Sequence, residues 1–187
     1  MGTTENQNDT ATVLVVDDKH GLADLYAAWL DKSYTTRTAY GGEEALDTID
    51  EAVDIVLLDR RMPGLSGDKV LERIRERGYD CRVAMVTAVD PDFGVLELSF
   101  DEYLVKPLSK EDIHEVVDQM FARSTLDEQR QQLCALISKK AALEAAKSQR
   151  ELDTNDEFAT LETEIDDLKT AVDEPVVDLD DSTRMRF

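Results

Sequence analysis

The stretch Asp54–Gly67, DIVLLDRRMPGLSG, decides the fold of this chain. It begins with a short apolar run that is typical of a strand buried on both faces of a parallel sheet. The run ends in Asp59, and a proline and two glycines then stop the strand and shape a loop before the next helix. Because open α/β sheets bind ligands beyond the carboxyl ends of their strands, Asp59 is predicted to be the reactive group. An alternative interpretation is that Asp59 only caps a helix or sits in a turn. Taken alone, the stretch supports this alternative about as well as it supports a reactive acid.

Four other segments have the pattern of strands, and they alternate with segments in which apolar residues recur at helical spacing. Besides 54–58, strands are predicted at 13–16, 35–39, 83–86 and 102–105. Helices are predicted at 20–30, 43–49, 70–78, 90–98 and 109–121. This alternation predicts an α/β fold with a parallel, doubly wound sheet and right-handed crossovers.

Four of the predicted strands end in residues that can carry chemistry. The first ends in Asp17 and Asp18, the third in Asp59, the fourth in Thr87 and the fifth in Lys106. Three carboxylates at one edge of a sheet repel one another, and a hard divalent cation such as Mg²⁺ removes that conflict. The cation and the Lys106 ammonium can neutralise a phosphoryl group, and the Thr87 hydroxyl can donate to it. Asp59 would then be the nucleophile that forms an acyl phosphate.

At these residues the chain resembles the receiver domain of two-component response regulators over residues 11–122. The motifs that carry the resemblance are ordered along the chain and fall at strand ends: Asp17-Asp18, Asp59 followed by Met62-Pro63-Gly64 and Gly67, Thr87-Ala88, and Lys106-Pro107. The resemblance implies a flavodoxin-like fold with a five-stranded sheet of order 2-1-3-4-5. It also implies transfer of a phosphoryl group from a sensor histidine kinase to Asp59, in a phosphoacceptor that is not a dedicated enzyme.

The resemblance further assigns roles to single residues. It implies that Mg²⁺ is bound by Asp59, directly by Asp18, largely through water by Asp17, and by the backbone carbonyl of Arg61. It assigns Thr87 as the switch hydroxyl, Tyr103 as the switch aromatic residue, and a cis bond to Lys106-Pro107. Arg61 and Val89 occupy positions that tune dephosphorylation in receivers, so the lifetime of the phosphorylated form does not follow from the motifs. Pro91 and Gly94 predict a weak fourth helix on the face where receivers usually bind partners.

From residue 123 to 174 the pattern is helical only. Thr154 followed by Glu157 resembles a capping box, so a second helix is predicted to begin there. Apolar residues on the two predicted helices could close a hairpin within the chain or pair between chains; they are Leu126, Leu133, Leu136, Ile137 and Leu143, then Phe158, Leu161, Ile165, Leu168 and Val172. Residues 133–144 and 158–162 are similar to the HalX domain that follows receivers in haloarchaeal proteins. Residues 1–10 are predicted to be a disordered lead, and 175–187 a flexible C-terminus.

The chain is strongly acidic, with a formal net charge of −21 and a pI of about 4.3. Residues 1–122 carry −14, residues 123–150 carry +3, and residues 151–187 carry −10. Such a charge disfavours non-specific contact with nucleic acid and anionic lipid, and it suits a halophile, because high salt screens self-repulsion. The basic segment contains Arg123, Arg130, Lys139, Lys140, Lys147 and Arg150. We interpret it as a solvated helix face that pairs with the acidic second helix, in preference to a nucleic-acid site.

Several other features narrow the function. No apolar run approaches the ~18 residues of a membrane span, and the N-terminus lacks the order of a signal peptide, so a cytoplasmic protein is expected. Cys81 and Cys134 fit buried thiols, while His20 and His114 fit ordinary structural roles and Trp29 fits the core. Two functions stay open: a phosphorylation-controlled module that acts on a downstream protein or a second copy, and a transcriptional regulator whose tail binds DNA. No helix-turn-helix, zinc or basic-zipper pattern supports the second, and no GxxxxGK[ST] loop supports a kinase.

Overall fold

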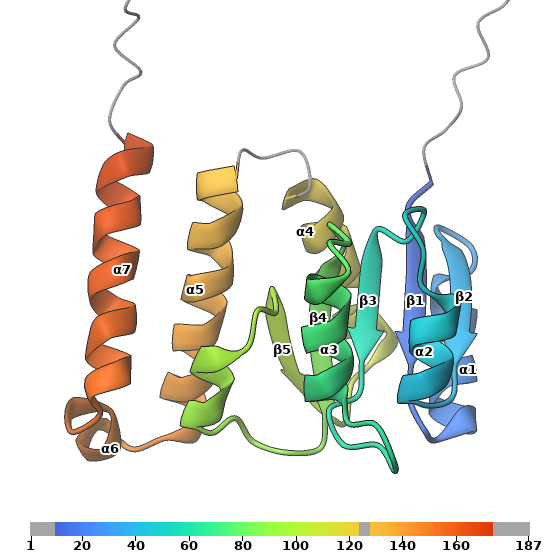
Figure 1. Cartoon of the computed structure of the whole chain (residues 1–187), viewed down its shortest axis with the longest axis horizontal. Helices are drawn as coiled ribbons and strands as arrows, with labels where there is room; N and C mark the ends of the chain where they lie inside the picture. The colour runs from blue at the N-terminus through green and yellow to red at the C-terminus, as the bar shows by residue number, and fades with distance from the viewer. Residues whose placement is uncertain (1–9, 124–127, 174–187) are drawn as a thin grey trace, which may run out of the picture.

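The computed structural model describes residues 10–123 and 128–173. Five parallel strands form one sheet of order β2-β1-β3-β4-β5, which confirms the expected fold (Figure 1). The strands are β1 (Thr12–Val16), β2 (Thr35–Ala39), β3 (Ile55–Leu58), β4 (Arg82–Thr87) and β5 (Glu102–Val105). The order reverses between β1 and β3, so ligands are expected at the carboxyl ends of these two strands.

Helices cover both faces of the sheet because successive strand residues point to opposite sides. One face packs against α1 (His20–Leu30) and α4 (Lys110–Arg123), through an apolar cluster that contains Val13, Val15, Ile55 and Leu57. The other face packs against α2 (Gly42–Thr48) and α3 (Gly67–Glu76), through a cluster that contains Leu14, Val16, Val56 and Leu58. Both layers are visible in Figure 1.

The C-terminal helices form a hairpin beyond the β5 edge of the sheet (Figure 1). It consists of α5 (Glu128–Ala146), the short α6 (Gln149–Asp153) and α7 (Asp156–Asp173). Leu143 of α5 and Phe158, Leu161 and Ile165 of α7 are buried in one cluster, so the first three residues of the predicted α7 seam are covered within the chain, while Leu168 and Val172 are only partly buried. In the described ranges, neither these helices nor any other is long and apolar enough to cross a membrane.

The fourth helical segment of the first domain differs from the expected helix over 90–98. It is a short 3-10 helix, η1 (Phe93–Glu97), and Pro91 lies outside it. The Asp92 carboxylate accepts a hydrogen bond of 3.0 Å from the backbone N–H of Gly94, which caps the turn. A proline, a glycine and a local carboxylate acceptor together favour a tight turn over a regular α-helix.

The start of α7 also corrects the sequence prediction. Thr154 is the residue at which α6 ends, and its hydroxyl donates to the backbone oxygen of Arg150 at 2.9 Å. The N-cap of α7 is Asn155, whose side chain accepts from the Phe158 N–H at 2.7 Å. The capping box lies earlier, at the start of α6, where Ser148 and Glu151 satisfy each other's backbone N–H groups.

Some residues expected in the core lie elsewhere. Leu25 and Ile137 are exposed, because each falls on the outer side of its helix, and Trp29 and Cys134 are only partly buried. Cys81 is buried as expected, and both cysteines are free thiols. Leu126, the side chain of Arg123, residues 1–9 and residues 175–187 lie outside what the structure describes. Lys139, expected on a solvated face, is buried.

Gly67 brings the start of α3 against the end of β3, and this contact fixes the loop that follows Asp59. A Cβ atom at position 67 would lie 2.2 Å from the backbone oxygen of Asp59 and 2.8 Å from the Cα atom of Arg60. The N–H of Gly67 donates to the Arg60 oxygen at 2.9 Å. Only glycine allows the two backbone segments to approach this closely.

We therefore expect Gly67→Ala to lower the free energy of unfolding by about 1–3 kcal/mol, because backbone atoms must shift to make room. Gly21→Ala is the matched control, since its Cβ would meet nothing within 4 Å. It should leave the free energy unchanged or raise it by up to about 1 kcal/mol. Equilibrium urea unfolding measures both, and equal stability of the two variants would contradict the close contact.

Candidate functional site

The strand-end residues predicted from the sequence meet at the carboxyl edge of the sheet. The N–H of Asp59 donates to the Val16 oxygen at 2.8 Å, which sets the end of β3 beside the end of β1. The N–H of Lys106 donates to the Thr87 oxygen at 2.8 Å, which does the same for β5 and β4. The Lys106-Pro107 peptide bond is cis, as the resemblance implies. Parallel register thus brings together residues that lie far apart in the sequence.

A buried ammonium connects two of the acids. The Nζ atom of Lys106 lies 2.5 Å from Asp17 Oδ2 and 3.5 Å from Asp59 Oδ1, and these side chains are 10%, 3% and 8% exposed respectively. Burial raises the pKa of the Asp59 carboxyl, although the Lys106 charge opposes this effect. Burial acts to lower the pKa of Lys106, but the hydrogen bond to Asp17 and the charge of Asp59 outweigh it, so this pKa is raised.

The acids outnumber the cations in this cluster. One carboxylate oxygen each from Asp17, Asp18 and Asp59 lies within 4.8 Å of the others. One ammonium cannot balance three carboxylates, so the pocket has an excess of negative charge that a second cation would neutralise. Hard oxygen donors in this number suit Mg²⁺, and the residues present therefore fit that ion. Arg61 belongs to the same loop, and its backbone N–H acts to lower the pKa of the Asp59 carboxyl against the effect of burial.

Thr87 carries a polar atom with no partner among the described residues. Its side chain is fully buried at the end of β4, and Oγ1 makes no hydrogen bond there. A buried hydroxyl without a partner costs about 1–3 kcal/mol, so its retention needs an explanation. An oxygen-rich ligand beside Asp59 would supply the acceptor.

Tyr103 lies beside the acid cluster and not within it. Its hydroxyl donates to the backbone oxygen of Val89 at 2.8 Å, and its ring packs at 5.7 Å from the ring of Phe100. The ring is buried in the same cluster as the hairpin's apolar residues. The chain from Thr87 to Val89 therefore connects the acid cluster to Tyr103 within two residues.

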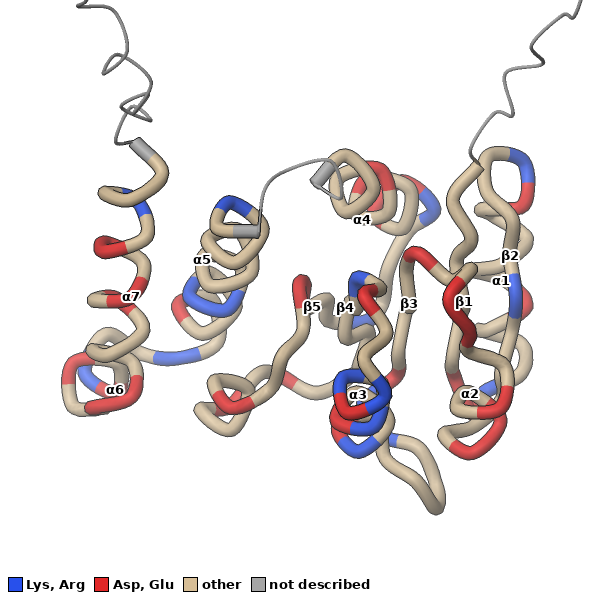
Figure 2. The backbone as a smooth tube through the Cα atoms, turned by 45° about the horizontal axis from the view of Figure 1, so that its top comes forward, with Lys and Arg blue, Asp and Glu red and all other residues tan. Residues whose placement is uncertain are grey.

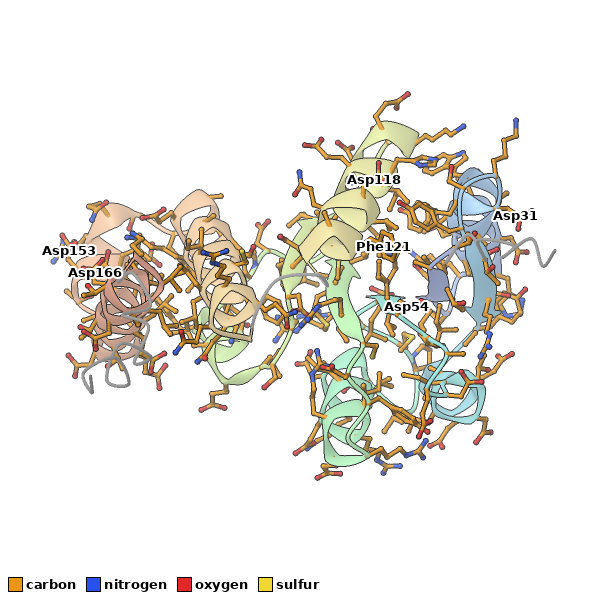
Figure 3. All side chains as sticks on the ribbon, turned by 90° about the horizontal axis from the view of Figure 1, so that it is seen from above. Asp31, Asp54, Asp118, Phe121, Asp153 and Asp166 are labelled. Atoms are coloured by element: carbon orange, nitrogen blue, oxygen red, sulfur yellow. The ribbon has the colours of Figure 1, made fainter. Side chains whose placement is uncertain are left out.

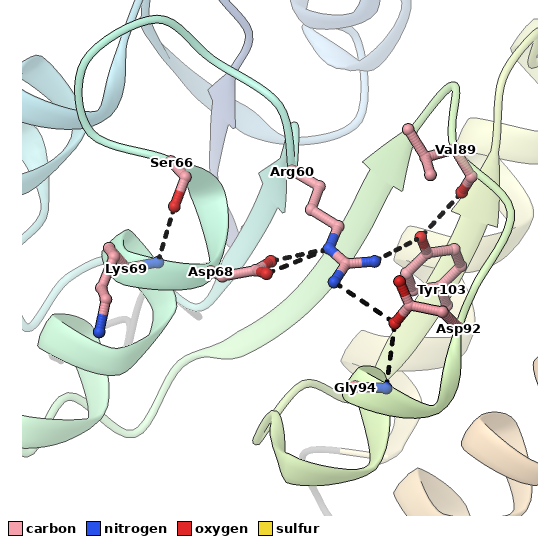
Figure 4. Close-up of polar contacts among 8 residues, drawn as sticks. All are labelled: Arg60, Ser66, Asp68, Lys69, Val89, Asp92, Gly94 and Tyr103. Carbon is pink, nitrogen blue, oxygen red and sulfur yellow. Dashed lines mark hydrogen bonds and ion pairs between the residues drawn. The ribbon is translucent and has the colours of Figure 1, made fainter.

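Arg60 is a residue of this region that the motifs did not single out. It directly follows Asp59, and its Nε atom donates to Asp68 Oδ1 at 3.0 Å and Oδ2 at 3.2 Å. Its Nη1 atom donates to the Tyr103 hydroxyl at 3.5 Å, and Nη2 lies 3.8 Å from Asp92 Oδ1 (Figure 4). The sequence carried no clear signal for Arg60, because β3 ends at Leu58 and Arg60 lies in the loop beyond the strand.

The remaining candidates have structural roles. His20 begins α1 and stacks on Tyr40 with ring centroids 4.1 Å apart, while the His114 ring forms a hydrogen bond of 2.7 Å with the Trp29 oxygen. The expected pairing of the hairpin helices is present at Lys140, whose Nζ atom lies 2.7 Å from Glu162. Figure 2 shows several basic positions along α5 and more acidic than basic positions along α6 and α7.

Comparisons with known proteins agree with this geometry. A sequence profile of the response regulator receiver domain matches residues 13–118, and a profile of the HalX domain matches residues 122–186. The chain therefore belongs to the response regulators, with a receiver domain followed by a HalX domain.

Individual relatives add detail. A protein of Haloferax volcanii, provisionally described as a transcriptional regulator, is 54% identical over 134 residues, which are 71% of this chain and 23% of that protein. The chain thus spans about a quarter of the length of that relative. The response regulator TrrA of Thermotoga maritima, solved in complex with Mg²⁺ and BeF, has 32% identity and a TM-score of 0.53 over 59% of this chain and 99% of that chain. The BeF3-activated receiver domain of DrrB has 26% identity and a TM-score of 0.56 over 61% and 99%.

The Thr87 hydroxyl, which has no hydrogen-bond partner among the described residues, leads to a prediction about stability. Thr87→Val should raise the free energy of unfolding by about 1 kcal/mol, because it removes a buried polar group that has no partner. Thr36→Val is the control, since the Thr36 hydroxyl donates to Asp31 at 3.2 Å. In the control variant the free energy of unfolding should fall by about 0.5–1.5 kcal/mol. Urea unfolding of both variants is the measurement, and a destabilised Thr87→Val variant would show that its hydroxyl is already satisfied.

Proposed function

We propose that this chain is a phosphorelay response regulator in which Asp59 accepts a phosphoryl group from a sensor histidine kinase. The observation that carries the proposal is that one ammonium and two further carboxylates gather at Asp59, while the neighbouring strand β4 ends in a buried hydroxyl that has no partner among the described residues. We take residues 11–122 as the receiver domain and residues 123–174 as the HalX-like helical domain. We place the protein in the cytoplasm, where a kinase would deliver its phosphoryl group.

The chemistry assigns a task to each group. A carboxylate oxygen of Asp59 forms the new P–O bond while the P–N bond of the kinase phosphohistidine breaks. The electron pair of that bond stays on the imidazole nitrogen. Mg²⁺ held by Asp17, Asp18, Asp59 and the Arg61 carbonyl would supply positive charge to the phosphoryl oxygens. Lys106 lies within reach of Asp59 and contributes a second positive charge.

The hydroxyl of Thr87 is the group best placed to detect the product. It is buried at the end of β4 with no partner in the described part of the chain, and donation to a phosphoryl oxygen would satisfy it. Val89, which accepts from Tyr103, follows two residues later, so a shift of this segment would reach Tyr103. The outcome is a population shift of a few kcal/mol at most on the face formed by β4, β5 and η1. A downstream protein or a second copy of the chain would recognise that face.

DNA binding by the tail is the second candidate, and it rests on the described function of the Haloferax relative. The charges of the hairpin favour a protein partner instead. Lys139 is buried, and Lys140 is paired with Glu162, so neither offers its charge to a phosphate backbone. With a net charge of −21, the chain as a whole would repel nucleic acid at low salt.

Substitution of the acceptor tests the proposal. Asp59→Asn should abolish Mg²⁺-dependent labelling by acetyl phosphate or by a cognate kinase, because an amide oxygen is a poor nucleophile. Asp54→Asn is the control, since Asp54 lies at the opposite end of the same strand and accepts from the Thr12 N–H at 2.7 Å (Figure 3). The control should label at the wild-type level. Full labelling of Asp59→Asn, read by phosphate-affinity gel or intact mass, would refute the assignment.

A further inference from the structure

The first helix of the receiver begins directly after the acid pair Asp17-Asp18, but it has no side-chain cap. Lys19 is the N-cap residue of α1 and forms no side-chain hydrogen bond to the first turn, and that turn contains no acidic residue. Helix starts are usually fixed by a Ser, Thr, Asp or Asn side chain at the N-cap position. The start of α1 therefore has to be held by contacts with other elements.

The two acids of the pair differ in how they are held. One carboxylate oxygen of Asp17 accepts the Lys19 N–H at 2.9 Å, and the other lies 2.5 Å from the Lys106 ammonium. Asp18 is partly exposed, and its carboxylate accepts no hydrogen bond from another described residue. The direction in which Asp18 presents its carboxylate therefore depends on the backbone of residues 17–20.

An aromatic pair holds this backbone from the outside. The His20 ring stacks on the Tyr40 ring, with centroids 4.1 Å apart and an angle of 28° between the ring planes. The Tyr40 hydroxyl also donates to Asp24 Oδ1 at 2.7 Å, one turn further along α1. Because residues four apart lie on the same face of a helix, Tyr40 contacts α1 at two successive turns.

Tyr40 is itself fixed in the loop between β2 and α2. Its backbone N–H donates to Glu44 Oε2 at 2.9 Å. The residue before it, Ala39, accepts the N–H of Asp17 at 3.2 Å. The loops that follow β1 and β2 are thus connected by a backbone hydrogen bond at Asp17 and by the aromatic stack at His20.

We propose that His20 and Tyr40 are positioning residues for the Mg²⁺ site, because their stack fixes the start of α1 and with it the direction of the Asp18 carboxylate. The inference rests on the proposed binding of Mg²⁺ at the acid cluster. Both residues act through the backbone of the β1–α1 loop, and neither is a ligand of the ion. A carboxylate that is already held in one direction loses less conformational freedom on binding, so the stack raises the affinity for Mg²⁺.

Calorimetric titration of the full chain with MgCl₂ alone, without a phosphodonor, tests the inference. Tyr40→Leu removes the stacked ring and should raise the dissociation constant for Mg²⁺ about 10-fold, which is within the usual effect of removing a group that orients a metal ligand. Tyr34→Leu is the matched control. Tyr34 lies just before β2, at the opposite end of the strand from Tyr40, and its hydroxyl likewise donates to an aspartate on a neighbouring helix, Asp118 of α4.

The control should bind Mg²⁺ with wild-type affinity. Equal affinities of Tyr40→Leu and Tyr34→Leu would overturn the inference and leave the proposed function intact. A wild-type chain that binds no Mg²⁺ would overturn both.

Further variants separate positioning from a general loss of stability. His20 is exposed, so His20→Ala should fold, and it should weaken Mg²⁺ binding as Tyr40→Leu does. His20→Phe and Tyr40→Phe keep a ring at each position, and they should bind Mg²⁺ more tightly than the variants that lack one. Saturating MgCl₂ should restore labelling of Tyr40→Leu by acetyl phosphate to the wild-type rate, because no ligand has been removed. A rate that stays low at saturating MgCl₂, or a His20→Phe variant that binds no better than His20→Ala, would contradict the positioning role.

Discussion

The structure depends on a charge imbalance at one edge of a parallel sheet. Register places Asp17, Asp18 and Asp59 together with Lys106 at the carboxyl ends of β1, β3 and β5, where three carboxylates share one ammonium. Such a cluster is costly in the absence of further cations, because burial and like charge both disfavour ionised carboxylates. The same excess of negative charge favours the binding of a divalent cation such as Mg²⁺. The close approach of Gly67 to Asp59 and the unsatisfied hydroxyl of Thr87 are best understood as parts of this arrangement.

The second domain, the α5–α7 hairpin, packs on the receiver at a distance from the acid cluster. The hairpin completes the apolar cluster on one side of the sheet, and it does so over η1, the least regular element of the receiver. Lys139 brings a charge into that apolar contact, and Asp92 at the start of η1 pairs with Arg60, the residue directly after Asp59. The two domains therefore share one apolar core within the chain.

Sequence patterns predicted the parallel sheet and the strand-end residues, because each buried strand is a short apolar run and parallel register brings the strand ends to one edge. The order of the strands followed from the resemblance to receiver domains. The sequence patterns failed where several weak local preferences compete. Pro91, Gly94 and Asp92 turned an expected helix into a 3-10 turn, and Asn155 took the capping role predicted for Thr154. They also failed at Lys139, which was interpreted as part of a solvated basic face but is buried by tertiary packing, whereas Lys140 pairs with the acidic second helix as expected. Arg60 was missed because no local motif contains its partners, which lie 8, 32 and 43 residues away.

The central claim is that the Asp59 carboxylate becomes an acyl phosphate. Reduction with borohydride tests it most directly, because hydride cleaves an acyl phosphate to an alcohol and leaves free carboxylates intact. After incubation with acetyl phosphate and MgCl₂ followed by borohydride, peptide mass spectrometry should find homoserine at position 59, and only when Mg²⁺ is present. Homoserine at Asp17 or Asp18 in its place, or no conversion at any aspartate, would contradict the account.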